Sequence, residues 1–156
     1  MDFPLIRKED YPLFHSLANA YYREGEDART PQDEVDAFIR FLFDKITGGE
    51  ISGCFAKTGE THAGFALWAM DSEDFSFSRM PGLGTIAEIG LLPAFRGSGH
   101  GKELVSFAEN ALRTVGASQC YVSAYGPAEN FWLRCGYEKT GETADNGLPI
   151  LVKTLV

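Results

Sequence analysis

Cysteine is scarce in this chain, and no two cysteines stand close together in the sequence. The three cysteines, Cys54, Cys120 and Cys135, are an odd number and include no CxxC pair. This pattern disfavours both a disulfide framework and a zinc site. The three histidines are also not spaced as metal ligands. We therefore expect no metal and a reducing, cytoplasmic setting.

Long hydrophobic runs are missing as well. No apolar segment approaches the roughly 20 residues that a membrane-spanning helix needs, and the first residues lack the basic and apolar regions of a secretory signal. We expect no membrane association. The 156 residues are 44% hydrophobic and 23% charged, which is a globular composition. We expect a single domain over 1–156.

The chain has no excess of positive charge. Its net charge is −8, and without a basic patch we expect no nucleic-acid partner. The acids are concentrated early, because residues 1–80 hold 15 acids against 8 bases and residues 81–156 hold 7 against 6. Either these acids keep a helical surface solvated, or the first half attracts a cation.

Hydrophobic periodicity and turn residues predict eleven elements. They are a strand over 3–8, a helix from Asp10, a helix over 30–46, strands over 51–57, 62–70 and 85–92, a helix over 99–115, a strand over 120–125, a short helix over 127–135, and strands over 137–142 and 149–156. Thr30 is the expected cap of the second helix, and 22–29 is an expected loop. This order indicates a mixed, partly antiparallel sheet with helices on both faces.

The most informative segment is the end of the strand over 85–92 and the glycine-rich turn that follows it. Glycines alternate at 97, 99 and 101 just before the third predicted helix, between Arg96 and Lys102. Glycine lets a backbone turn its N–H groups toward a ligand, and a helix N-terminus adds unsatisfied N–H groups. The turn therefore predicts a pocket for a phosphate or diphosphate.

Two common phosphate motifs do not fit this turn. A P-loop requires GxxxxGK[ST], but Glu103 follows Lys102 and Arg96 occupies the first glycine position. A dinucleotide fingerprint requires GxGxxG, but its last position is Lys102. The pattern that fits is [Q/R]xxGx[G/A], which runs from Arg96 to Gly101.

This pattern resembles the diphosphate-binding signature of the GNAT superfamily of acetyl-coenzyme A-dependent N-acetyltransferases. The resemblance covers 91–112 and resumes over 128–141, where AENFWLRCGYEKTG is similar to a second family motif. It implies an α/β fold with a largely antiparallel, twisted sheet of about six to seven strands and about four helices. It also implies acetyl-CoA as the cosubstrate.

The resemblance further implies which residues bind the coenzyme. Backbone N–H groups of the turn would hold the diphosphate, and the pantetheine arm would pair with a strand that splays from its neighbour. An isolated strand glycine at Gly90 independently suggests a bulge or a close backbone approach, although simple packing space is the alternative. The implied binding residues are Ile89, Gly90, Leu91, Leu92, Arg96, Gly97, Ser98, Gly99, His100, Gly101, Lys102 and Trp132.

For catalysis we choose Glu88 as the base that removes a proton from the attacking amine, since an alkylammonium is not nucleophilic. The alternative is a solvent-facing or paired strand residue. The family's usual tyrosine acid is Trp132 here, and Trp132 cannot donate a useful proton. Tyr125 is then the candidate acid, or the thiolate leaves unaided. We expect direct transfer without an acetyl-cysteine intermediate.

The acceptor region in this fold is the segment around the first two helices. Here it combines aromatic rings with carboxylates, which suits an ammonium group. Its candidate residues are Tyr21, Tyr22, Glu24, Glu26 and Asp27, with Trp68 as a further wall. A small, polyamine-like primary amine is the expected acceptor, and a solvated loop is the alternative reading of the same residues.

Three alternatives stay open at this point. The same turn would hold another acyl-CoA equally well. A non-catalytic coenzyme A sensor or interaction module would keep the turn and lack turnover. A homodimer through exposed sheet edges is also compatible with the sequence.

Overall fold

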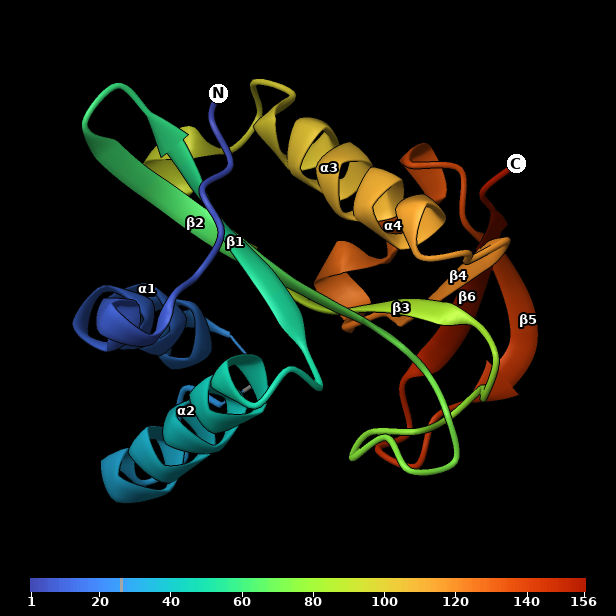
Figure 1. Ribbon diagram of the computed structural model, residues 1–156, viewed down its shortest axis with the longest axis horizontal. Coiled ribbons are helices and arrows are strands. Elements are labelled where there is room, and N and C mark those ends of the chain that lie inside the picture. Colours follow the sequence, from blue (N-terminus) through green and yellow to red (C-terminus); the bar gives the residue numbers. More distant parts are fainter. Residues whose placement is uncertain (26) are drawn as a thin grey trace. The chain divides into compact units, whose positions relative to one another are not determined.

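The computed structural model describes residues 1–25 and 27–156, so Glu26 lies outside the described residues. Within them the chain forms four α-helices and six strands (Figure 1). In chain order they are α1 (Tyr11–Glu24), α2 (Gln32–Thr47), β1 (Ser52–Thr58), β2 (Thr61–Met70), β3 (Gly84–Leu91), α3 (His100–Thr114), β4 (Gln119–Ser123), α4 (Glu129–Arg134), β5 (Glu138–Thr143) and β6 (Pro149–Thr154).

The six strands form one sheet in the order β1-β2-β3-β4-β6-β5. β3 and β4 pair in parallel, with Gly84 opposite Cys120 and Thr85 opposite Tyr121. The connection between these two strands contains α3, as a parallel pair requires. β4 with β6 and β5 with β6 pair antiparallel. The predicted mixed, largely antiparallel sheet with four helices is confirmed.

The first predicted strand is only partly formed. Residues 2–6 run beside β1 with isolated bridges from Asp2 to Lys57 and from Leu5 to Cys54. Pro4 accepts a hydrogen bond from the Phe55 N–H but has no N–H to donate. This interruption keeps the segment from forming a regular strand, and a 3-10 turn over Lys8–Asp10 follows it.

Helix α1 extends further than the sequence suggested. The stretch from Tyr22 onward was expected to be a loop, but α1 continues to Glu24. Tyr22 is buried and its ring packs edge-on against Phe38 of α2, with centroids 5.6 Å apart. The aromatic contact therefore outweighs the charged neighbours, and α1 and α2 lie side by side (Figure 1).

Helix α2 begins two residues later than its predicted cap. Pro31 stands at the cap position, and the helix starts at Gln32. The hydroxyl of Thr30 instead donates to Asp27 Oδ1 at 3.2 Å. Its apolar residues recur three and four apart and face the interior, with Val35, Ile39 and Leu42 buried.

The chain divides into two compact units. The first comprises residues 1–67 and 88–104, and the second comprises 68–87 and 105–156. In the first unit Phe14 packs edge-on against Phe65 with centroids 5.5 Å apart. In the second, the buried Glu109 accepts a hydrogen bond from Tyr137 Oη at 2.8 Å and pairs with Lys153 Nζ at 2.9 Å. Among the described helices, none is both long and apolar enough to cross a membrane.

Candidate functional site

The glycine turn before α3 has the backbone geometry that its sequence predicts. Gly97 and Gly99 adopt φ values of 83° and 84°, which an L side chain rarely allows. A Cβ at either position would meet no atom within 4 Å. Conformation, rather than crowding, therefore requires glycine at both positions. Ser98 between them is exposed, and so is Lys102 in the first turn of α3.

The start of α3 leaves donors available beside this turn. The first bond into the helix runs from the Glu103 N–H to the Gly99 carbonyl at 3.2 Å. The N–H groups of the first helical residues, 100–102, consequently have no partner within the helix. Buried Nδ1 of His100 also has no hydrogen-bond partner among the described residues. Such a nest of outward N–H groups at a positive helix end fits a diphosphate.

Arg96 makes a contact that the sequence did not predict. Its guanidinium binds the Glu24 carboxylate with both ends, at 2.5 Å and 2.8 Å, and its Nε donates to the Leu91 carbonyl at 3.0 Å. The hydrogen bond lowers the pKa of Glu24 and raises the pKa of Arg96. The structure thus joins a predicted acceptor residue to a predicted coenzyme residue. The two are 72 positions apart, and no local pattern signals the pair.

Gly90 in β3 is closely packed where its Cβ would be. A Cβ there would lie 2.5 Å from Cδ1 of the Tyr21 ring. On the neighbouring strand, a Cβ at Gly64 would lie 2.0 Å from the Gly90 carbonyl oxygen. The space at Gly90 is therefore used for packing against Tyr21, which was the alternative reading of this glycine. Next to it Ile89 and Leu91 are half-buried, and the Leu92 N–H donates to the Ala63 carbonyl at 2.8 Å.

Glu88 and Tyr22 are two titratable residues of the first unit that interact with one another. Glu88 is half-buried in β3, and Tyr22 of α1 is only 5% exposed. Burial raises the pKa of Tyr22 well above its usual value, and the charge of Glu88 raises it further. A side-chain interaction with Glu88 raises this pKa as well, and the buried Tyr22 oxygen has no further hydrogen-bond partner among the described residues. The Glu88 carboxylate therefore favours the protonated form of the Tyr22 phenol.

The remaining predicted residues belong to the second unit. Tyr125 is half-buried just beyond β4, and its carbonyl accepts the Ala128 N–H at 2.7 Å. Trp132 is 5% exposed and packs edge-on against Tyr137 with centroids 5.1 Å apart. Trp68 is equally buried and packs against Phe107. The burial of both tryptophans indicates core residues, and Trp68 has little surface to offer an acceptor.

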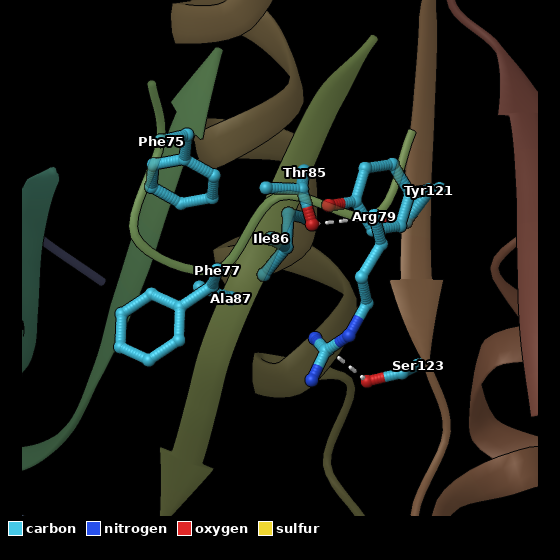
Figure 2. Close-up of a pocket in the computed structure, with 8 residues that line it drawn as sticks. All are labelled: Phe75, Phe77, Arg79, Thr85, Ile86, Ala87, Tyr121 and Ser123. Atoms are coloured by element: carbon cyan, nitrogen blue, oxygen red, sulfur yellow. Dashed lines mark hydrogen bonds between the residues drawn. The ribbon is translucent and has the colours of Figure 1, made fainter. Parts of the chain in front are cut away.

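The second unit also contains a small hollow that sequence reasoning missed. Figure 2 shows Arg79 reaching between β3 and β4 toward Ser123, whose hydroxyl lies 3.5 Å from the guanidinium. Arg79 also pairs with Asp145 at 3.2 Å. The buried carboxylate of Asp71 positions this segment by accepting the N–H groups of Arg79 and Met80 and the Tyr121 hydroxyl. The lining residues are Phe75, Phe77, Arg79, Thr85, Ile86, Ala87, Tyr121 and Ser123.

A mixed sheet whose third strand leads through a glycine nest into a helix defines a protein that binds a diphosphate-bearing ligand. The comparisons with known proteins name the family. The model of the Acetyltransferase (GNAT) family matches residues 11–137. The chain belongs to the GNAT acetyltransferase family, and it is a transferase that uses acetyl-CoA.

The fold is similar to those of several solved acetyltransferases. The PaiA N-acetyltransferase from Thermoplasma acidophilum, solved with coenzyme A, is 15% identical with a TM-score of 0.73, over 99% of each chain. A GCN5-related N-acetyltransferase from Ralstonia eutropha JMP134 is 20% identical with a TM-score of 0.75, over 92% of this chain and 96% of that one. An aminoglycoside 6′-acetyltransferase type Ii is 15% identical with a TM-score of 0.70, over 100% and 98%. No curated protein sequence matches the chain.

Proposed function

We propose that this enzyme transfers the acetyl group of acetyl-CoA to the primary amine of a small molecule by direct attack. The observation that carries the proposal is the turn at Gly97 and Gly99, whose positive φ values precede the N–H groups at the start of α3 that have no partner within the helix. These N–H groups, from about residue 97 to 102, bind the diphosphate. The pantetheine arm runs along Ile89 to Leu92, and a backbone N–H in that strand stabilises the oxyanion.

Glu88 is the general base of this reaction. It accepts a proton from the acceptor's ammonium, directly or through a water, and the freed nitrogen forms a bond to the thioester carbonyl carbon. The carbon–sulfur bond then breaks, the nitrogen loses its second proton to solvent to give the amide, and the sulfur leaves as coenzyme A thiolate. Tyr125 donates the proton that the sulfur takes up. Unaided departure of the thiolate is the other route, because a thiol has a pKa near ~8.5.

The buried cysteines support direct attack. Burial raises the pKa of Cys54 to about 12 and the pKa of Cys120 to about 11. Both therefore stay as thiols near neutral pH, and a thiol is a poor nucleophile. An acetyl-cysteine intermediate at either position would require a thiolate that this environment disfavours.

A cationic, polyamine-like acceptor fits the residues around the end of α1. Tyr21 and Tyr22 provide aromatic surface, and the acids of the first half outnumber its bases by 15 to 8. The Glu24 carboxylate, also among the expected acceptor residues, is paired with Arg96. The aminoglycoside 6′-acetyltransferase, which shares this fold, is named for an amine-bearing acceptor.

Release of free coenzyme A thiol from acetyl-CoA in the presence of an amine tests the proposed reaction. We expect amine-dependent release with some members of a panel of polyamines, aminoglycosides, amino acids and peptides. Coenzyme binding without turnover on any of them would contradict the proposal.

Glu88→Gln tests the base. We expect it to lower kcat/KM by about 100-fold or more near pH 7, where the amine is protonated, and by much less near pH 10, where the amine is already free. Matched pH profiles of the two proteins are the measurement. Superimposable profiles would remove Glu88 from the mechanism.

A further inference from the structure

A small hollow lies where α1, the α1–α2 connection and the start of α2 meet, within the first unit. Its volume is about 60 Å³, and it is lined by Tyr22, Asp27, Thr30, Glu34, Val35 and Phe38. Only Tyr22 and Asp27 belong to the acceptor residues chosen from the sequence. A water has a share of about 30 Å³ in the liquid, so the hollow has room for a terminal methylene and its ammonium group.

One residue that lines the hollow has an unsatisfied polar atom. Tyr22 is 5% exposed, and its hydroxyl has no hydrogen-bond partner among the described residues. Leaving a buried hydroxyl unbonded is costly, and native structures seldom do so without a functional reason. An oxygen in this position is an acceptor for a ligand's N–H.

Negative charge surrounds that oxygen. Asp27 and Glu34 line the hollow, and the charges of Glu88 and Asp27 both act on the Tyr22 hydroxyl. Two arginines stand near these residues in the sequence: Arg29 of the connection is exposed, and Arg23 at the end of α1 donates its guanidinium hydrogens to the backbone carbonyls of residues 27, 28 and 30. Arg23 therefore holds the connection in place without pairing with either carboxylate in these bonds.

The apolar lining suits the carbon chain of the same ligand. The rings of Tyr22 and Phe38 are edge-on, with centroids 5.6 Å apart, and Val35 is buried beside them. Aromatic faces attract a cation as well as methylene groups. The hollow thus combines two carboxylates, one unbonded oxygen and apolar walls, which is the chemistry of an alkylammonium site.

We propose that this hollow binds a second, non-reacting ammonium group of the acceptor, so that the preferred acceptor is a diamine or polyamine. The inference rests on the proposed function, because the reacting amine is the one that Glu88 deprotonates. Tyr22 links the two regions, since it lines the hollow and its hydroxyl is acted on by the charge of Glu88 and, less strongly, by that of Asp27. Asp27, Glu34 and Tyr22 are the residues that distinguish a dication from a monoamine.

The test compares two acceptors of equal chain length, 1,4-diaminobutane and n-butylamine. For the wild-type enzyme we expect kcat/KM to be about tenfold or more higher with the diamine, in line with a charge-assisted hydrogen bond. Asp27→Asn keeps the size of the side chain and an oxygen that accepts the Thr30 hydroxyl. Glu34→Gln likewise keeps the size and removes the charge. Both variants are expected to lower the diamine value severalfold and to leave butylamine unchanged.

Asp33→Asn is the matched control. Asp33 lies in the first turn of α2 beside Glu34 and is exposed, but it does not line the hollow. This variant loses the same unit of charge, and we expect the ratio between the two acceptors to stay at the wild-type value. An equal change in this ratio in all three variants would overturn the proposal. It would show that the preference for the diamine depends on the net charge of the protein and not on the residues of the hollow.

A binding measurement separates this inference from the proposed function. Calorimetric titration of 1,4-diaminobutane into the enzyme with coenzyme A present needs no turnover. If Asp27→Asn and Glu34→Gln bind the diamine more weakly and Asp33→Asn does not, the result would support the hollow as an ammonium-binding site, even if no amine were acetylated. Equal acetylation of both amines would overturn the proposal that the hollow binds a second ammonium group. It would not contradict the proposed acetyl transfer.

Discussion

At the scale of single residues, two buried tyrosines differ in whether their hydroxyls are bonded. Tyr137 donates to the buried Glu109 at 2.8 Å, and burial raises its pKa well above the usual value. Tyr22 is nearly as buried, but its hydroxyl has no partner among the described residues. Removing the two oxygens should therefore have different consequences.

We predict that Tyr137→Phe lowers the free energy of unfolding by about 1–2 kcal/mol, since the buried Glu109 loses one of its donors and keeps Lys153. Tyr22→Phe should leave the free energy of unfolding unchanged or raise it by up to about 1 kcal/mol, because no bond is lost. Urea unfolding of both variants checks this. A loss in Tyr22→Phe as large as that in Tyr137→Phe would show that the Tyr22 hydroxyl is bonded.

Sequence spacing could identify the glycines of the turn but not the neighbours of Gly90. Gly97 and Gly99 follow a local rule, because a positive φ is a property of the residue and its immediate neighbours. Gly90 is glycine because Tyr21, from another element, occupies the position of its missing Cβ. A contact of this kind leaves no signature in the residues around it.

At the scale of elements, the end of α1 is tied to the turn before α3 by the Glu24–Arg96 ion pair. Both side chains are nearly half exposed, at 44% and 45%. An ion pair with this exposure contributes about 1 kcal/mol or less to stability. Its more important effect is on charge, because Glu24 neutralises the guanidinium that stands next to the glycine turn, where we propose that the diphosphate binds.

Single variants of this pair distinguish two roles of Arg96. If the guanidinium assists diphosphate binding, Arg96→Gln should weaken coenzyme A by about tenfold, whereas Glu24→Gln should bind it as well as the wild type or more tightly. Calorimetric titration with coenzyme A is the measurement. Equal weakening in both variants would instead mean that Arg96 acts only by holding Glu24.

Elements with a strong apolar period were predicted well, and elements held by long-range contacts were not. The stripe of α2 and the extent of α3 follow from residues three and four apart. The end of α1 depends on Phe38, which belongs to the next helix. The first strand was wrong as a regular element because one missing N–H at Pro4 interrupts the ladder.

At the scale of the whole molecule, charge is the property that the sequence alone describes best. The chain carries −8, and the first 80 residues account for most of it, with 15 acids against 8 bases. A field of this sign attracts cations and repels anions over a Debye length, which is about 10 Å at 0.1 M salt. The two substrates of the proposed reaction carry opposite charges and should respond oppositely to salt.

We predict that raising the salt concentration from about 20 to 200 mM increases KM for 1,4-diaminobutane severalfold. KM for n-butylamine, which has half the charge, should rise less. KM for acetyl-CoA should stay level or fall. Screening weakens the repulsion of this anion from the net negative chain, which lowers KM, and this offsets the weaker attraction to the glycine turn. Initial rates are measured at fixed pH, with one substrate varied at each salt concentration. They give the slope of KM against salt concentration for each of the three substrates. Identical slopes for the diamine and the monoamine would mean that the acids of the first half only solvate its helices and do not select the acceptor.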